Sequence, residues 1–179
     1  MNALPEHDNI NLSFKLFVIQ SWDGYSPYNY GYTPDEWKLD VEGGQTLLFT
    51  SFDNAGRNNQ IYPGQIIDGV TPTLRNYQEG AAERNTLGYS FYGDAVYDIN
   101  ISFAHSGSSL KLNFAGAGTT NLNDIESWGL DDVKLLARSS SKGLQGWTTY
   151  VDENLNGKRD SGEISTKTDA QGKYSFTLS

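Results

Sequence analysis

Apolar residues in this chain recur with a period of two, and this pattern constrains the fold more than any other feature. Within 97–103, Tyr97, Ile99, Ile101 and Phe103 alternate with polar residues. Successive side chains of a β-strand point to opposite faces, so the alternation predicts a strand with one buried and one solvated face. Helical periodicity is hard to find in the chain. The sequence therefore predicts an all-β protein.

Other segments carry strand patterns: 14–19, 37–41, 46–52, 110–114 and 132–137. The run 14–19 is almost continuously apolar, which indicates a central strand. Short turns predict two hairpins, one joining 97–103 to 110–114 through 106–109, and one joining 37–41 to 46–52 around 42–44. Several short strands separated by turns favour a β-sandwich, and the pattern leaves the immunoglobulin and jelly-roll types open.

The chain divides at a serine-rich linker, 139–143. We expect a β-sandwich domain over residues 1–138 and a short β-segment over residues 144–179. The stretch 53–86 is polar and irregular. A loop of that length inside a compact domain is uncommon unless it is functional or is pinned by other residues.

Composition excludes several classes of function. The net charge of −9 argues against nucleic acid and against an anionic membrane as partners. The absence of cysteine excludes disulfides, thiolate zinc sites and a cysteine nucleophile. His7 and His105 lie in no catalytic motif, and no phosphate-binding glycine loop or zinc spacing is present. We therefore expect no enzymatic activity, although a triad assembled in space is not visible in a sequence.

The most specific motif covers residues 152–163. It matches the pattern D-x-[DN]-x-[DN]-G-x5-E in full. Calcium takes six to eight oxygen ligands, and alternate residues of a tight loop supply them, with Gly157 permitting the sharp turn. The predicted calcium ligands are the backbone carbonyl of Lys158 and the side chains of five further residues: Asp152, Asn154, Asn156, Asp160 and Glu163. The alternative is an Asn/Gly-rich turn that binds no metal.

The flanks of this motif differ from those of an EF-hand. Residues 146–151 favour a strand, and residues 173–178 alternate apolar and polar side chains. An EF-hand loop joins two helices. The sequence therefore predicts an EF-like calcium loop between strands.

The C-terminal segment 144–178 resembles the opening of a B-type repeat domain from bacterial surface adhesins of the serine-aspartate repeat class. The resemblance rests on the 152–163 motif, on Gly146, and on the series Thr168-Asp169-x-x-Gly172-x-Tyr174-x-Phe176. It implies a calcium-stiffened stalk or spacer in a secreted protein. The chain ends at Ser179, so only part of such a module is expected.

Residues 1–138 resemble a jelly-roll-like β-sandwich module of exported bacterial proteins. The closing stretch Glu126-Ser-Trp-Gly-Leu-Asp131-Asp-Val133 is similar to the last strand of MAM and carbohydrate-binding domains. In that group an acidic residue before the final strand often holds a structural calcium ion. The resemblance makes Asp131 or Asp132 a candidate metal ligand, against the alternative of a solvated turn.

Aromatic residues crowd the stretch from Trp22 to Trp37. Aromatic rings stack on the apolar faces of sugars and also anchor protein contacts. The candidate ligand-binding residues are Trp22, Tyr25, Tyr28, Tyr30 and Tyr32. The alternative is a loop that packs its rings onto the sandwich.

Together these features predict a calcium-binding, non-catalytic, extracellular binding module, secreted or at the cell surface, with a carbohydrate as candidate ligand. The alternative is a structural or adhesive surface protein that calcium rigidifies and whose partner is protein or matrix. A glycan and a surface protein both stay open as partners, and insertion into a membrane is not expected.

Overall fold

The computed structural model describes residues 4–25, 34–89, 92–117, 126–139 and 143–177. These residues form no helix, and so none that is long and apolar enough to span a membrane. The strands are β1 (Asn9–Ile19), β2 (Glu36–Val41), β3 (Thr46–Ser51), β4 (Glu83–Arg84), β5 (Asp94–Ala104), β6 (Leu112–Ala117), β7 (Ser127–Arg138), β8 (Thr148–Tyr150) and β9 (Ser165–Lys167). The predicted all-β class is confirmed.

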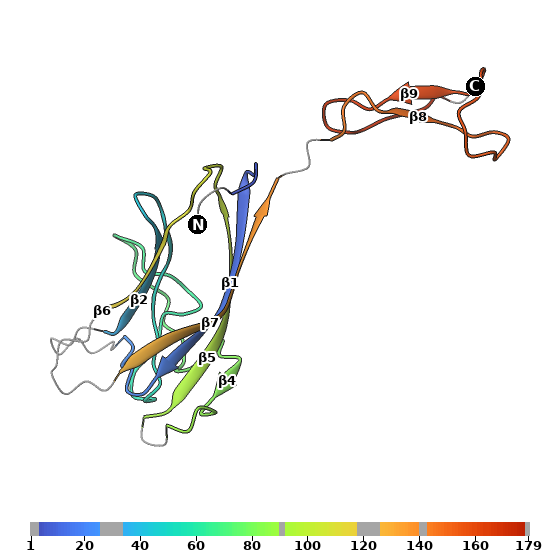
Figure 1. Ribbon diagram of the computed structural model, residues 1–179. Coiled ribbons are helices and arrows are strands. Elements are labelled where there is room, and N and C mark those ends of the chain that lie inside the picture. Colours follow the sequence, from blue (N-terminus) through green and yellow to red (C-terminus); the bar gives the residue numbers. More distant parts are fainter. Residues whose placement is uncertain (1–3, 26–33, 90–91, 118–125, 140–142, 178–179) are drawn as a thin grey trace. The chain divides into compact units, whose positions relative to one another are not determined.

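The chain forms two compact units, Met1–Arg138 and Ser139–Ser179. The first unit contains a sheet of order β4-β5-β1-β7 and a second sheet of order β3-β2-β6 (Figure 1). Their pairings are antiparallel. The arrangement is β-sandwich-like, because the hydrophobic core draws its residues from both sheets.

Strand β1 is central in its sheet, as its apolar sequence predicts. Its burial alternates without interruption along the strand. The inward side chains are all at most 3% exposed: Ile10, Leu12, Phe14, Leu16 and Val18. Each such burial contributes about 1.5–3 kcal/mol relative to an exposed side chain. The inner face of β1 therefore forms much of the core.

Aromatic rings join the two sheets across the core. The ring of Phe14 on β1 lies 5.9 Å from that of Trp37 on β2 and 5.5 Å from that of Phe114 on β6, the latter edge to face. Trp37 also meets Trp128 of β7 edge to face, with ring centroids 6.0 Å apart. Edge-to-face and tilted geometries favour such pairs beyond the area they bury.

One of the two predicted hairpins is confirmed and the other is wrong. β2 and β3 pair with each other, as expected. β5 and β6 lie in different sheets, because β6 pairs with β2. The 106–109 connection therefore crosses from one sheet to the other. Both strands have one apolar face, and these faces cover the same core from opposite sides rather than lying side by side.

Strand β7 contains the predicted segment 132–137, but its burial pattern is interrupted. Leu135 and Ala137 are half-buried, whereas Val133 is 52% exposed. The register of β7 against β1 shifts between Ser13 and Lys15. This bulge turns Val133 outward, although the sequence pattern places it with Leu135 and Ala137.

The long irregular stretch after β3 is pinned by buried polar side chains. Gln60 is fully buried, and its Nε2 donates to the carbonyls of Tyr62 and Glu79, both at 2.8 Å. Its Oε1 accepts from the Tyr97 hydroxyl at 3.2 Å. Buried backbone carbonyls need such partners, because an unpaired one costs about 1–3 kcal/mol.

Asn54 and Gln78 attach the same stretch to the sheet. The Nδ2 of Asn54 donates to the carbonyl of Val18 at 2.8 Å, at the end of β1. The Nε2 of Gln78 donates to the carbonyl of Asp94 at 3.0 Å, at the start of β5. A loop whose only named strand among the described residues is the two-residue β4 is thereby fixed on the end of the sandwich.

In the second unit, the predicted strand within 146–151 is present as β8. Its partner is β9, whereas residues 173–177 form no strand. The Oδ1 of Asp169 accepts the backbone N–H groups of Gln171 and Lys173, at 2.8 and 2.9 Å. This side-chain hydrogen bonding favours a turn directly before the alternating residues.

Replacing Gln60 by leucine tests the pinning of the loop. Gln60→Leu fills the same space with an apolar side chain but leaves the hydrogen-bonding partners of the amide unpaired. We expect the free energy of unfolding to fall by about 3 kcal/mol or more. Urea denaturation measures the change. The matched control is Gln65→Leu, at an exposed position of the same loop, which should stay within about 0.5 kcal/mol. Equal effects of the two substitutions would contradict the pinning role.

Alkaline pH offers a second test of the core. Burial raises the pKa of the Tyr97 phenol above its usual value. Because the folded state favours the neutral phenol, its contribution to stability is complete below about pH 10, the pKa of an unfolded tyrosine, and is lost as pH rises towards the folded pKa. The free energy of unfolding should therefore fall less steeply above pH 10 in Tyr97→Phe than in the parent. Parallel curves would show that the Tyr97 phenol ionises as readily in the folded state as in the unfolded state.

Candidate calcium-binding loop

The loop 152–163 lies between the paired strands β8 and β9 of the second unit. The N–H of Val151 donates to the carbonyl of Ile164 at 2.9 Å, which closes the base of the loop. The strand pairing therefore holds the first and last residues of the motif close together.

The carboxylate of Asp152 organises the first half of the loop. Its Oδ1 accepts the N–H of Asn156 at 3.1 Å, and its Oδ2 accepts the N–H of Gly157 at 2.7 Å. Leu155 and Gly157 both have positive φ, 58° and 73°. Leucine adopts this conformation at a cost of about 1–2 kcal/mol, which the hydrogen bonds to Asp152 help to offset.

The two asparagines meet Asp160. The Nδ2 atoms of Asn154 and Asn156 donate to the same oxygen, Oδ2 of Asp160, at 2.7 and 2.6 Å. Side chains from the first and second halves of the loop therefore converge on one point. A half-turn of either amide about its last torsion exchanges the NH₂ group for the carbonyl oxygen at that point.

Glu163 joins the two ends of the loop. Its Oε1 accepts the N–H of Glu153 at 3.2 Å, and its Oε2 accepts the N–H of Asp160 at 2.8 Å. Both oxygens of the last motif residue are thus turned back onto the loop. The backbone N–H of Lys158 donates to Oδ1 of Asn156 at 2.7 Å, and the ligand role of its carbonyl stays a prediction.

The donors of this loop suit calcium. The carboxylates of Asp152, Asp160 and Glu163 and the side-chain amides of the two asparagines together contain the hard oxygen atoms that calcium prefers as ligands. Among the described residues, no group of three or more His, Cys, Asp or Glu side chains is gathered closely enough to hold a metal ion. Calcium binding would therefore need the amide oxygens of Asn154 and Asn156 to face Asp160 in place of their NH₂ groups.

The other candidate metal ligand, Asp131, lies on the exposed part of β7. Its Oδ1 accepts the N–H of Asp132 at 2.7 Å, and its register partner on β1 is Lys15. Asp132 lines a shallow depression together with Asp98, Lys15 and Lys134. Lys15 pairs with Asp98 at 3.1 Å, and the two ammonium groups offset the charge of the two carboxylates there, which leaves little net negative charge to attract a cation. The calcium role of Asp131 gains no support from this setting.

The two aromatic candidates that the structure describes, Trp22 and Tyr25, differ in their exposure to solvent. Trp22 is fully buried, meets Phe52 edge to face, and donates its indole N–H to the carbonyl of Ser127 at 2.9 Å. This corrects the expectation that Trp22 contacts a ligand, because its ring has no open face. Tyr25 is 37% exposed and forms a β-bridge with Asn59. The remaining candidates lie outside the described residues: Tyr28, Tyr30 and Tyr32.

The two histidines hydrogen-bond to each other, with His7 Nε2 and His105 Nδ1 at 2.7 Å. His7 Nδ1 contacts the carbonyl of Pro5 at 2.6 Å. The pair connects the segment before β1 to the end of β5. This arrangement gives the histidines a structural role in the first unit.

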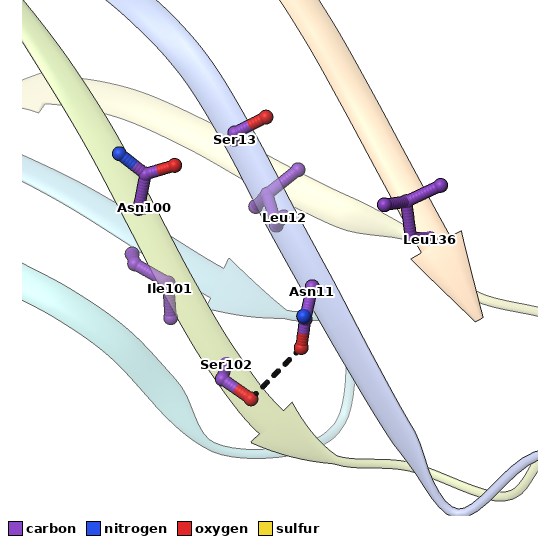
Figure 2. Close-up of a pocket in the computed structure, with 7 residues that line it drawn as sticks. All are labelled: Asn11, Leu12, Ser13, Asn100, Ile101, Ser102 and Leu136. Carbon is purple, nitrogen blue, oxygen red and sulfur yellow. Dashed lines mark hydrogen bonds between the residues drawn. The ribbon is translucent and has the colours of Figure 1, made fainter. Parts of the chain in front are cut away.

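The outer face of the first sheet bears a shallow hollow of about 280 Å³, lined by both polar and apolar side chains. Figure 2 shows that its polar side chains come from β1 and β5, and that Leu136 borders it from β7. The hydroxyl of Ser102 donates to Oδ1 of Asn11 at 3.0 Å and lies 2.8 Å from Oδ1 of Asn9. These side chains satisfy one another, which leaves them less to offer a ligand.

A second hollow, which the sequence patterns did not indicate, lies among loops at the start of β5. Its lining residues are Asn54, Ala55, Asn85, Gly88, Tyr89, Tyr92 and Gly93. The signal was present as tyrosine, asparagine and glycine side by side in the irregular stretch before β5. Such a short cluster is a weaker pattern than the crowding of aromatic residues at 22–37.

Comparison with protein-family models, with curated proteins and with solved structures finds no match to this chain. The functional argument therefore rests on the residues and their geometry.

Proposed function

We propose that this chain is a calcium-binding, non-catalytic module of a secreted or cell-surface protein, with calcium held by the loop 152–163. The observation that carries the proposal is the convergence of Asn154, Asn156 and Asp160 on one point of that loop, at 2.6–2.7 Å. Asp152 and Glu163 direct their oxygens onto the same loop through backbone N–H groups.

Calcium fits this ligand set better than other common metal ions. Zinc prefers nitrogen and sulfur ligands, and the chain has no cysteine. Magnesium demands near-ideal octahedral geometry and keeps several waters, whereas calcium accepts six to eight oxygens in flexible arrangements. A loop that offers carboxylate, amide and carbonyl oxygens from alternate residues matches the flexible ion.

Calcium would supply stability that the second unit lacks. Strands β8 and β9 are short, and large apolar side chains remain open to solvent: Leu144 (61% exposed), Trp147 (63%), Leu155 (88%) and Tyr174 (57%). Units of about 40 residues usually need a metal ion, disulfides or a partner to fold stably. Because the chain has no cysteine, disulfides cannot stabilise the second unit, whereas calcium binding coupled to folding can.

An extracellular setting follows from the same proposal. Calcium sites of extracellular modules work at dissociation constants of about 10⁻⁴–10⁻³ M, which cytosolic calcium does not reach. The resemblance to adhesin B-type repeats for the second unit, and to jelly-roll modules for the first, points the same way. We include the jelly-roll-like topology of the first unit in the proposal.

The first test is calorimetric titration of the chelated protein with calcium, beside thermal melts with calcium and with EDTA. Calcium at a hundred times its dissociation constant should stabilise the second unit by about 2.7 kcal/mol. Glu163→Gln should weaken binding by about tenfold or more, equivalent to ~1.4 kcal/mol, because it removes a charge and a strong ligand.

The matched control is Glu153→Gln, which removes the same charge from an exposed position of the loop whose side chain is not a predicted ligand. It should bind calcium almost as the parent does. Asn154→Ala should fall between the two variants. Equal losses in Glu163→Gln and Glu153→Gln, with no loss in the uncharged Asn154→Ala, would show that only net charge matters. Absence of heat in the parent would remove the proposal.

The alternative of a structural or adhesive protein shares the calcium loop and differs in the partner. The exposed Trp147 and Tyr174 favour it, because aromatic residues are enriched among the anchors of protein interfaces. Under this alternative, Trp147→Ser abolishes binding to an immobilised preparation of extracellular-matrix proteins in a solid-phase assay. Unchanged binding, or none by the parent, would count against adhesion through this unit.

A further inference from the structure

The hollow at the start of β5 has the properties of a preformed binding site. Its volume is about 400 Å³, compared with about 280 Å³ for the hollow on the sheet. It lies where the backbone of Gln20, just after β1, donates to the carbonyl of Gly93, just before β5. Loops from distant parts of the chain therefore form its walls.

Asp94 fixes the loop that carries most of the lining residues. Its carboxylate is fully buried and accepts the N–H groups of Thr86 at 2.9 Å, Leu87 at 3.1 Å and Tyr89 at 3.4 Å. The Oδ1 of Asn85 accepts the N–H of Asp94 at 3.3 Å. These hydrogen bonds hold the backbone of residues 86–89 in place before any ligand arrives, which lowers the entropic cost of binding.

Glycine keeps the hollow open. Gly93 has a positive φ of 79°, and a Cβ atom added there would lie 2.6 Å from Oδ1 of Asn85. Any larger residue would displace the amide that caps Asp94. Gly88 has a φ of 86°, and a Cβ atom added there would meet no other atom within 4 Å. The absence of a side chain at this position leaves that space open.

The lining combines aromatic rings with neutral hydrogen-bonding groups. Tyr89 is 40% exposed, Tyr92 is half-buried, and Asn85 is exposed. The described residues of the lining include no carboxylate, ammonium or guanidinium group. The nearby guanidinium of Arg57 lies over the Tyr92 ring, 5.7 Å from its centroid. Sugars present apolar C–H faces to such rings and hydroxyls to amides and phenols, so this lining matches a neutral sugar better than an ion.

The charge of the whole protein supports a neutral ligand. A net charge of −9 repels polyanions over the range of a Debye length. Uronic-acid and sulfated glycans therefore approach this surface less readily than uncharged ones.

We propose that the hollow formed by Asn85, Tyr89 and Tyr92 binds a neutral sugar residue of a glycan, with Tyr89 as the stacking ring. The site adds a ligand to the proposed binding module and rests on that function only for its extracellular setting. It belongs to the first unit and needs none of the residues of the calcium loop.

The test is affinity gel electrophoresis of the whole chain against soluble neutral polysaccharides (a xyloglucan, a galactomannan, a mixed-linkage β-glucan and an arabinoxylan), with pectate and alginate as anionic comparisons. The parent should be retarded by at least one neutral polysaccharide. Tyr89→Ala should reduce affinity for it by tenfold or more. The matched control is Tyr77→Ala, which removes a ring that is 51% exposed and does not line the hollow.

The outcomes separate this site from the calcium proposal. The sugar site is supported, whether or not calcium binds, if retardation meets two conditions. It persists in EDTA and in Glu163→Gln, and among the variants only Tyr89→Ala removes it. No retardation by any neutral polysaccharide overturns it, as do equal losses in Tyr89→Ala and Tyr77→Ala. Retardation only by pectate or alginate, lost in Arg57→Ala, would overturn the neutral class of ligand.

Discussion

The first unit depends on the hydrogen bonds of side chains buried at one end of its two sheets. The irregular stretch after β3 crosses that end, and its backbone groups lose contact with water there. Gln60, Asn54 and Gln78 provide partners for the carbonyls of this stretch and of the strand ends. The buried carboxylate of Asp94 likewise accepts backbone N–H groups of the loop before β5. The proposed sugar site lies on that loop, so it depends on the same kind of buried hydrogen bond.

The second unit meets the problem of stability in a different way. It has short strands and leaves large apolar side chains open to solvent, so burial contributes less there than in the first unit. The loop 152–163 instead carries three carboxylates whose oxygens accept backbone N–H groups or asparagine NH₂ groups of the same loop. Under the proposed function, calcium bound there would supply stability that burial does not.

The sequence predicted strands well and their neighbours poorly. Alternation in β1 and β5 shows which face of a strand is buried, but both a hairpin and a crossover satisfy the same pattern, so β6 was assigned to the wrong neighbour. The alternation near the C-terminus also favoured a strand, whereas β8 pairs with β9 and residues 173–177 form none. Trp22 looked like a ligand-binding residue because a crowded aromatic stretch does not reveal which rings point inward. The spacing of Asp152, Asn154, Asn156 and Asp160 was more informative, since the loop brings together residues close in sequence.

The most direct test of the calcium account is hydrogen exchange of individual backbone amides, measured by NMR with calcium and with EDTA. Calcium should slow exchange strongly at Asn156, Gly157 and Asp160 and across β8 and β9, while amides of β1 and β5 exchange at the same rates in both conditions. This pattern would show that the metal orders the second unit through the loop. Identical exchange at Gly157 in both conditions, or slowing spread evenly over the whole chain, would contradict the account.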